Sequence, residues 1–310
     1  MKIITVTLSP AIDVHCSTSS LLPGHEHLAT VTSRDFGGKG INISRVLTAN
    51  RVSNTALVVL GDKSAEEFSR HLSSEGIDHC DFIVPGRIRE NITIHTDDGK
   101  ETRISFSAPV DSDGIWNQIE EKLFSMITKE SMVTLTGRVP EGISLDSIKR
   151  TLCELKTRGV KVVIDSKSFS LCDLLDCRPW MIKPNEEEIK TYIGETVKTL
   201  EDAMSAATMI YQNDIDNVMV SLGAQGAVFV CSEGSFTAIP PSISPISTIG
   251  AGDSAIAGFL AAHTCGTTAE ECLRSAVAYG TAACLVEGTR APSPDLIATI
   301  YPGIQVQKLI

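Results

Sequence analysis

Between about residue 110 and residue 221, short apolar stretches alternate with segments of helical period. The apolar stretches are rich in valine, isoleucine and leucine, and hydrophobic residues recur at helical spacing between them. Strands that are apolar on both faces and separated by helices are typical of a parallel sheet covered on each side. The pattern therefore predicts an α/β fold whose ligands bind at the carboxyl ends of the strands. The expected strands cover residues 132–136, 161–165, 180–183 and 217–221.

Two segments break this alternation. Residues 12–35 have no helical period, and residues 87–107 alternate in polarity around the turn Asp97-Asp98-Gly99-Lys100. The second pattern predicts a β-hairpin. We expect both segments to form a small β-sheet beside the main body, in the position of a lid, within a single domain that spans residues 1–310.

The composition restricts the partners of the chain. The net charge is −11 and there is no block of basic residues, which argues against nucleic acid and against a membrane surface. No apolar window is long enough for a transmembrane helix. The nine cysteines include no CxxC pair, so they indicate neither a disulfide framework nor a zinc site. Reduced thiols in a cytoplasmic protein are the expectation.

Residues 247–254, Ser-Thr-Ile-Gly-Ala-Gly-Asp-Ser, have the composition of an anion-binding turn. Gly250 and Gly252 allow a tight turn with exposed amides, and the apolar residues after it predict a helix whose N-terminal dipole faces the same point. Asp253 would repel a phosphate if binding were its sole task. We therefore expect Asp253 to accept a proton from an attacking hydroxyl, although an ordinary acidic first turn of a helix is the alternative.

Residues 37–42, Gly-Gly-Lys-Gly-Ile-Asn, open a second predicted helix. The glycines permit close approach of the backbone to a ligand, and Lys39 and Asn42 supply a cation and an amide at the start of the helix. The pattern lacks the GxxxxGK[ST] spacing of a Walker A loop. A glycine-rich helix start without a ligand is the alternative.

Two further segments follow predicted strands. Asn185 and Glu188 share one face of a first helical turn, which suits a hydrated Mg²⁺ and equally suits an acidic turn that matches the helix dipole. Residues 221–226 contain glycines at positions 223 and 226 and could cradle nucleotide phosphates or simply connect two strands.

Arginines stand where the lid and a strand end could meet. Arg89 and Asn91 open a lid strand, and Arg138 follows the strand that ends at Thr136. A fork of donors at that point suits a phosphate, whereas solvated surface arginines are the alternative. Asp13, after the first strand, could accept hydrogen bonds from sugar hydroxyls or serve as a turn residue.

Taken in order, these motifs resemble those of the PfkB branch of the ribokinase-like carbohydrate kinases, over essentially the whole chain. The resemblance implies a three-layer αβα body with a mainly parallel central sheet and a small β-sheet lid that forms a homodimer contact. It also implies transfer of the γ-phosphoryl group of ATP, with Mg²⁺, to a sugar hydroxyl. The motifs that carry it are residues 7–13, 37–42, 183–188, 221–226 and 248–254.

The resemblance assigns roles to the motif residues. Asp253 becomes the catalytic base, beside an anion hole formed by Gly250, Ala251 and Gly252. The implied ATP site is Lys183, Asn185, Ser221, Gly223 and Gly226, and Mg²⁺ is held through water by Asn185 and Glu188. The implied sugar-phosphate site is Asp13, Gly37, Gly38, Lys39, Asn42, Arg89 and Asn91, to which we add Arg138 because of its position after the strand that ends at Thr136.

Within the family, residues 7–13 and Lys39 are similar to the kinases of sugar phosphates. The leading expectation is ATP-dependent conversion of fructose 1-phosphate to fructose 1,6-bisphosphate, with tagatose-6-phosphate kinase or 6-phosphofructokinase activity as the alternatives. A non-catalytic sensor of sugar phosphates or nucleotides is a further alternative. Two departures bear on the substrate, because Arg138 stands where the family has serine and Ile88 stands where it has threonine.

Overall fold

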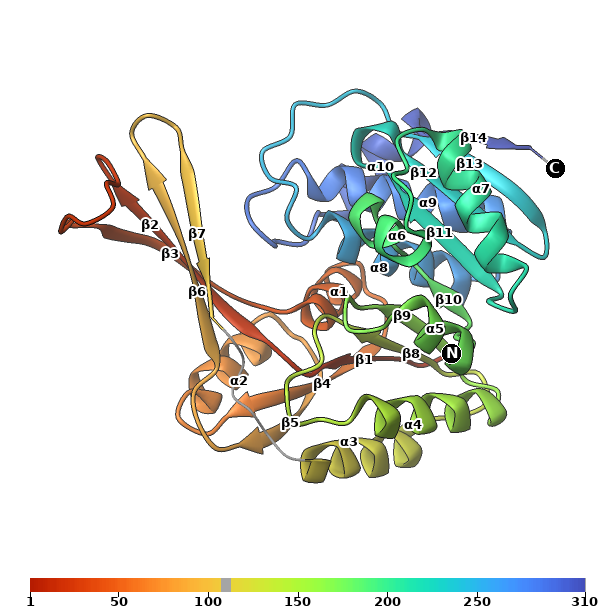
Figure 1. Cartoon of the computed structure of the whole chain (residues 1–310), viewed down its shortest axis with the longest axis horizontal. Coiled ribbons are helices and arrows are strands. Elements are labelled where there is room, and N and C mark those ends of the chain that lie inside the picture. Colours follow the sequence, from red (N-terminus) through yellow and green to blue (C-terminus); the bar gives the residue numbers. More distant parts are fainter. Residues whose placement is uncertain (107–112, 310) are drawn as a thin grey trace.

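The computed structural model describes residues 1–106 and 113–309, and ten strands of this part form one large sheet (Figure 1). Six neighbouring pairs of strands are parallel, and the three pairs at one edge are antiparallel. From the antiparallel edge the order is β14 (Gln305–Lys308), β13 (Gly234–Ile239), β12 (Ala227–Cys231), β11 (Asn217–Ser221), β10 (Met181–Ile182), β9 (Lys161–Asp165), β8 (Met132–Thr136), β1 (Ile3–Thr7), β4 (Asn54–Gly61) and β5 (His79–Val84).

The strands are apolar because helices cover both faces of the sheet. Alternate residues of β9 show this, since Val162 and Ile164 pack into one hydrophobic cluster and Val163 packs into another on the opposite face. The first face carries α3 (Asp113–Met126), α4 (Leu145–Thr157), α5 (Leu171–Cys177), α6 (Glu186–Ile193) and α7 (Leu200–Tyr211). The other face carries α1 (Lys39–Ala49), α2 (Ala65–Ser74), α8 (Ala251–Thr264), α9 (Ala269–Ala283) and α10 (Pro294–Ile300).

The expected three-layer α/β architecture is thus confirmed, with two differences in detail. The strand expected over residues 180–183 is only two residues long, Met181–Ile182. The antiparallel edge of β12, β13 and β14 lies outside the alternation from which the sheet was predicted.

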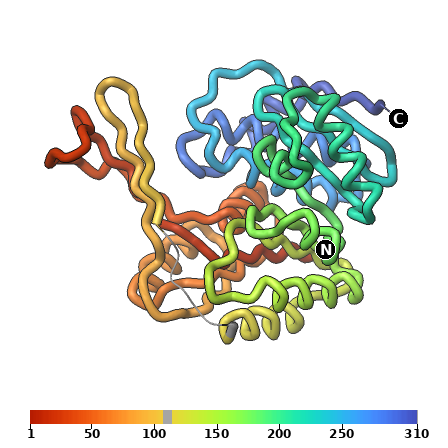
Figure 2. The backbone as a smooth tube through the Cα atoms, viewed as in Figure 1, coloured from red at the N-terminus to blue at the C-terminus, as the bar shows by residue number. Residues whose placement is uncertain are grey.

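A second sheet of four strands extends away from the main body (Figures 1 and 2). β2 pairs with β6 in parallel, and the two outer strands are antiparallel to their neighbours. The expected turn is present, because Gly99 has a φ of 78° and the amide of Thr96 donates to the carbonyl of Lys100 at 3.0 Å. Residue 107, the last of the expected range 87–107, lies outside the described residues. The order is β3 (Thr30–Gly37), β2 (Ala11–Thr18), β6 (Arg89–Thr96) and β7 (Glu101–Ser105).

Two findings concern the general class of the chain. Every helix within residues 1–106 and 113–309 is too short or too polar to cross a membrane. All nine cysteines lie within the described residues and are free thiols.

Candidate active site

The anion-binding turn leads directly into α8. This helix begins at Ala251, within the glycine-rich turn itself and before the apolar residues that predicted it. Gly250 precedes it in the left-handed conformation with a φ of 78°. Asp253 is therefore part of the first helical turn. The amides of a first turn have no acceptor within their helix, so they point outward and attract anions. Only the Ala251 amide is engaged locally, in a long contact of 3.4 Å to the carbonyl of Thr248.

Asp253 is buried at this helix start and bonded to the other glycine-rich segment. The Asn42 Nδ2 atom donates to Asp253 Oδ2 at 2.8 Å, which joins two residues that the sequence predicted separately. Burial raises the pKa of Asp253 to about 6, with Lys39 opposing the shift and Asp165 adding to it. A carboxylate with this pKa is ionised at neutral pH and is a stronger base than an exposed aspartate.

Two lysines converge on Asp165, the buried last residue of β9. Lys39 Nζ lies 3.0 Å from Asp165 Oδ1, and Lys183 Nζ lies 3.7 Å from Asp165 Oδ2. Burial alone would raise the pKa of Asp165, but Lys183 and Lys39 lower it. Burial alone would lower the pKa of Lys39, but the carboxylates of Asp165, Asp253 and Glu188 raise it above its usual value. Asp165 was predicted to end a strand at the ligand edge, but no local motif indicated its partners.

Lys183 also lies against the start of α8. A Cβ atom placed on Gly252 would be 3.2 Å from Lys183 Nζ, so the absence of a side chain at Gly252 leaves room for the ammonium group. An ammonium group and the positive end of a helix dipole therefore meet beside Asp253. This combination can hold the phosphates of a nucleotide next to a general base.

Asn185 and Glu188 form a reciprocal helix cap at the start of α6. The Glu188 amide donates to Asn185 Oδ1 at 3.0 Å, and the Asn185 amide donates to Glu188 Oε2 at 3.1 Å. Asn185 and Glu188 thus lie at an acidic helix start. The remaining oxygen, Glu188 Oε1, is buried without a hydrogen-bond partner and lies 3.8 Å from Lys39 Nζ. A buried carboxylate oxygen with unused lone pairs fits a water molecule of a hydrated cation.

The turn after β11 lies beside this cap, because the Ser221 amide donates to the carbonyl of Pro184 at 3.1 Å. Its two glycines differ. Gly226 has a φ of 102°, and a Cβ atom there would lie 1.9 Å from the carbonyl oxygen of Ala238, so this glycine allows the chain to pass close to β13. Gly223 has a φ of 52°, and a Cβ atom there would meet no heavy atom within 4 Å. Of the two, Gly223 is the one that faces open space.

A second polar group lies on the small sheet. Asp13 Oδ1 accepts hydrogen bonds from Asn91 Nδ2 at 2.8 Å and from Arg103 Nη2 at 2.7 Å. The guanidinium group of Arg89 donates to the carbonyls of Ser9 and Pro10, both at 3.3 Å. Arg103, on β7, was missed from the sequence; its position in the predicted hairpin, across from the strand of Asn91, was the only signal.

Two further guanidinium groups lie close to that of Arg89. Burial lowers the pKa of Arg89, with Arg138 and Arg103 adding to the effect and Asp13 opposing it. Arg138 is exposed at the end of β8, on the main body. Since two cations act on a third, this part of the site attracts anions.

Gly38 connects the polar residues around Asp165 and Asp253 with those of the small sheet. It has a φ of 146°, and a Cβ atom there would lie 2.7 Å from Thr7 Cγ2 and 3.2 Å from Pro10 Cα. The start of α1, with Lys39, therefore packs directly on the loop whose carbonyls hold Arg89.

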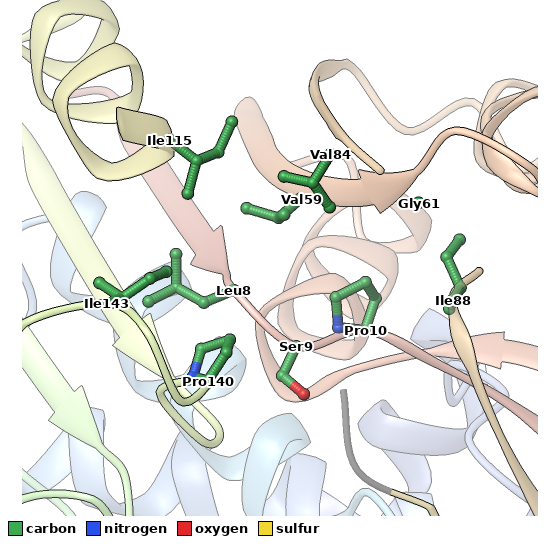
Figure 3. A pocket seen from close by; sticks show the side chains of 10 residues that line it. All are labelled: Leu8, Ser9, Pro10, Val59, Gly61, Val84, Ile88, Ile115, Pro140 and Ile143. Carbon is green, nitrogen blue, oxygen red and sulfur yellow. The ribbon is translucent and has the colours of Figure 1, made fainter. Parts of the chain in front are cut away.

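Figure 3 shows a small cavity at the same junction. Its volume is about 20 Å³, room for about one water molecule. It is too small for a sugar phosphate. Its lining is Leu8, Ser9, Pro10, Val59, Gly61, Val84, Ile88, Ile115, Pro140 and Ile143.

Comparison with known proteins supports a common origin for these features. A family model described as pfkB family carbohydrate kinase matches residues 4–296. A protein of Vibrio cholerae named 1-phosphofructokinase is 30% identical over 308 residues, covering 99% of this chain and 97% of that protein. The structure of Escherichia coli phosphofructokinase-2 with substrates and products has a TM-score of 0.89 and 28% identity, covering 97% and 99% of the two chains. A tetrameric inhibited form of that enzyme has a TM-score of 0.87 and 26% identity, covering 97% and 98%.

Proposed function

The chain belongs to the pfkB family of carbohydrate kinases, and from that premise we propose that it transfers the γ-phosphoryl group of ATP to fructose 1-phosphate, giving fructose 1,6-bisphosphate. The observation that carries the proposal is the position of Asp253, buried in the first turn of α8 and bonded to Asn42, with Lys39 and Lys183 around it. A general base, an anion-binding helix start and two ammonium groups are the parts that phosphoryl transfer to a hydroxyl requires.

In the proposed mechanism, Asp253 accepts the proton of the sugar hydroxyl as its oxygen attacks the γ-phosphorus atom. The first-turn amides of α8, from Gly250 to Gly252, and Lys183 stabilise the charge that develops on the transferred group. The bond to the β-phosphate oxygen breaks, and ADP leaves. Asp253 then releases its proton to solvent.

ATP would lie along Lys183, Asn185, Ser221 and Gly223, where the turn after β11 adjoins the cap of α6. We assign Gly226 to the shape of this turn, because of its close approach to Ala238. Mg²⁺ would be held through water by the free Oε1 atom of Glu188, with Asn185 keeping that side chain in place. When bound, the cation neutralises charge on the ATP phosphates.

We propose that the phosphate already present on the sugar binds Arg89, Arg103 and Arg138, while Asp13 and Asn91 face the sugar hydroxyls. The proximity of Arg103 and Arg138 to Arg89, whose pKa they lower in addition to burial, supports this assignment. Gly37, Gly38, Lys39 and Asn42 would line the path from that phosphate to Asp253. Curated relatives named 1-phosphofructokinase favour fructose 1-phosphate, whereas a structure of Escherichia coli phosphofructokinase-2 in complex with fructose-6-phosphate makes that sugar phosphate the second candidate.

We further propose a homodimer formed through the small sheet, which would act as the lid. The sheet and its adjoining loops expose large apolar side chains that a partner could cover, with Leu28 95% exposed and Val31 57% exposed. The tetrameric form of the Escherichia coli relative makes a higher assembly the alternative. The nine free thiols favour the cytoplasm.

The test is ADP release with Mg²⁺ and ATP against fructose 1-phosphate, fructose 6-phosphate, tagatose 6-phosphate and free fructose. The highest kcat/KM is expected with fructose 1-phosphate. Preference for another phosphosugar would change the substrate but keep the phosphate site, and preference for free fructose would refute it. Binding of a phosphosugar without any turnover would identify the chain as a sensor.

A further inference from the structure

A second and much larger cavity lies at the opposite edge of the large sheet, where β10 and β11 begin. Its volume is about 310 Å³, which is within the range of small-molecule sites. Trp180 and Asn217 line it from the strand starts, and His263 lines it from the C-terminal end of α8. Since Asp253 is in the first turn of the same helix, this cavity is separate from the candidate active site.

Five of the thirteen residues that line this cavity carry aromatic rings. The rings of Phe229 and Phe259 have centroids 5.2 Å apart in an edge-to-face arrangement, and Trp180 and His263 are 4.8 Å apart. Tyr211 adds a fifth ring from the end of α7. Aromatic faces carry partial negative charge and attract cations within about 6 Å of their centroids.

The formal charges that line the cavity are negative. Asp216 and Glu233 are exposed at its rim. Burial and the neighbouring Lys161 lower the pKa of His263 to about 4, so this ring is neutral at pH 7. Glu233 Oε2 accepts from the Ala269 amide at 3.1 Å, which holds this carboxylate at the rim.

The chain itself shows that the Trp180 ring accepts an ammonium group. Lys161 Nζ lies 5.0 Å from the centroid of this ring and 2.5 Å from His263 Nε2. Lys161 is not among the residues that line the cavity, and its ammonium group is engaged by Trp180 and His263. An anionic ligand would face both carboxylates, and a metal ion would lack a cluster of three ligands among the described residues.

We propose that this cavity is a binding site for a small organic cation of the alkylammonium class. The charge would lie between the aromatic faces and the carboxylates of Asp216 and Glu233, and the alkyl groups would fill the apolar part of the cavity. Nothing in this assignment depends on the substrate of the kinase reaction.

The experiment uses choline chloride as the probe and 3,3-dimethylbutan-1-ol as its neutral analogue of the same shape. Binding to the full-length protein is followed at constant ionic strength and pH 7.5 by saturation-transfer NMR on the ligand methyl signals, and the Kd by calorimetry. We expect saturable choline binding with a Kd in the region of 1 mM, and binding of the neutral analogue at least tenfold weaker.

Two isosteric substitutions, Asp216→Asn and Glu233→Gln, remove the charges and keep the shape. Together they are expected to weaken choline binding at least tenfold. Asp214→Asn is the matched control, since Asp214 pairs with Arg178 on the surface nearby and does not line the cavity; its Kd should equal that of the parent. The proposal is overturned by absence of saturable binding, by equal binding of the neutral analogue, or by a double variant that binds choline as the parent does.

Discussion

The two sheets of this chain differ in burial and in the kind of polar group they carry. All eight residues of β4 in the large sheet are buried, whereas all five residues of β7 in the small sheet are exposed. At the carboxyl edge of the large sheet, Lys39 and Lys183 contact the buried Asp165, and Asn42 is bonded to the buried Asp253. The small sheet presents Arg89 and Arg103, which are bound to backbone carbonyls and to Asp13.

This difference suggests that the two sheets have different functions in the reaction. Groups that take part in bond making require fixed positions and shifted pKa values, which burial between helices provides. Groups that recognise a phosphate require long cationic side chains that remain accessible. Substitutions in the large sheet should therefore change kcat or stability, and substitutions in the small sheet should change the KM for the sugar phosphate.

The largest effect is expected for Asp253→Asn. The amide cannot accept the proton, so kcat should fall by roughly 10²- to 10⁴-fold while the Kd for ATP stays within about twofold. Steady-state kinetics and nucleotide titration measure the two quantities. A variant with a kcat near that of the parent would remove Asp253 from the mechanism.

The same variant provides a control for folding. The pKa of Asp253 is about 6 in the folded protein and 3.8 in the reference state, so its ionisation opposes folding increasingly as the pH rises from about 4 to about 6 and fully above that. Asp253→Asn should therefore be more stable than the parent at pH 7.5, by up to about 3 kcal/mol. Reduced stability in urea unfolding would mean that the carboxylate has a structural role.

Gly226→Ala should affect stability most. The added Cβ atom would lie 1.9 Å from a backbone oxygen at a φ of 102°, so we expect a loss of about 3 kcal/mol in the free energy of unfolding. Gly223→Ala is the matched control, with open space around the Cβ atom and an expected cost of about 1 kcal/mol. Equal costs in urea unfolding would contradict the distinction between the two glycines.

Arg89→Ala tests the small sheet. Loss of a charge-assisted contact to phosphate, worth about 2 kcal/mol, should raise the KM for the sugar phosphate roughly 30-fold while the KM for ATP changes little. Arg34→Ala is the control on the same sheet, because Arg34 forms an exposed ion pair with Glu90. A fall in kcat at unchanged KM would break the proposed division between the sheets.

The pH profile should follow Asp253. Because its pKa is about 6, kcat/KM should be level above pH 7 and fall tenfold for each pH unit well below 6. The ionisation of the substrate phosphate is distinguished from that of Asp253 by measuring the profile again with saturating sugar phosphate. The residual activity of Asp253→Asn should lack this acidic limb, and a level profile down to pH 5 would exclude Asp253 as the titrating base.

Arg138→Ser should have the smallest effect. Arg138 is exposed, so solvent weakens its contribution, and we expect the KM for the sugar phosphate to rise roughly two- to fivefold. The ratio of kcat/KM for fructose 1-phosphate and fructose 6-phosphate measures whether this residue also selects the substrate. An increase of 30-fold or more would place Arg138 on a par with Arg89.

Much of the fold could be predicted from the sequence, because strands buried on both faces and helices with one apolar face have different periods. The strands that end at Thr136, Asp165 and Ser221 were predicted with their observed bounds. The strand at Met181 was predicted too long, because Trp180 and Lys183, which flank the apolar pair, do not pair in the sheet.

The site could be predicted only where a local motif carried it. Asn42 and Asp253 stand in recognisable turns, and their contact followed from the fold. Asp165 and Arg103 lie in ordinary strands, and their partners are set by which strands become neighbours in space. Three-dimensional pairing of this kind has no local sequence signal.

The contacts of the site also determine when it can form. Asn42 and Asp253 are 211 positions apart in the chain, and Lys39 and Asp165 are 126 apart. Such long separations make chain closure slow and delay the contact until most of the fold exists. During synthesis, Asn42 must therefore remain without its contact to Asp253 until nearly five-sixths of the polypeptide has been made. A ribosome-bound intermediate of this protein would have much of its large sheet and no kinase activity.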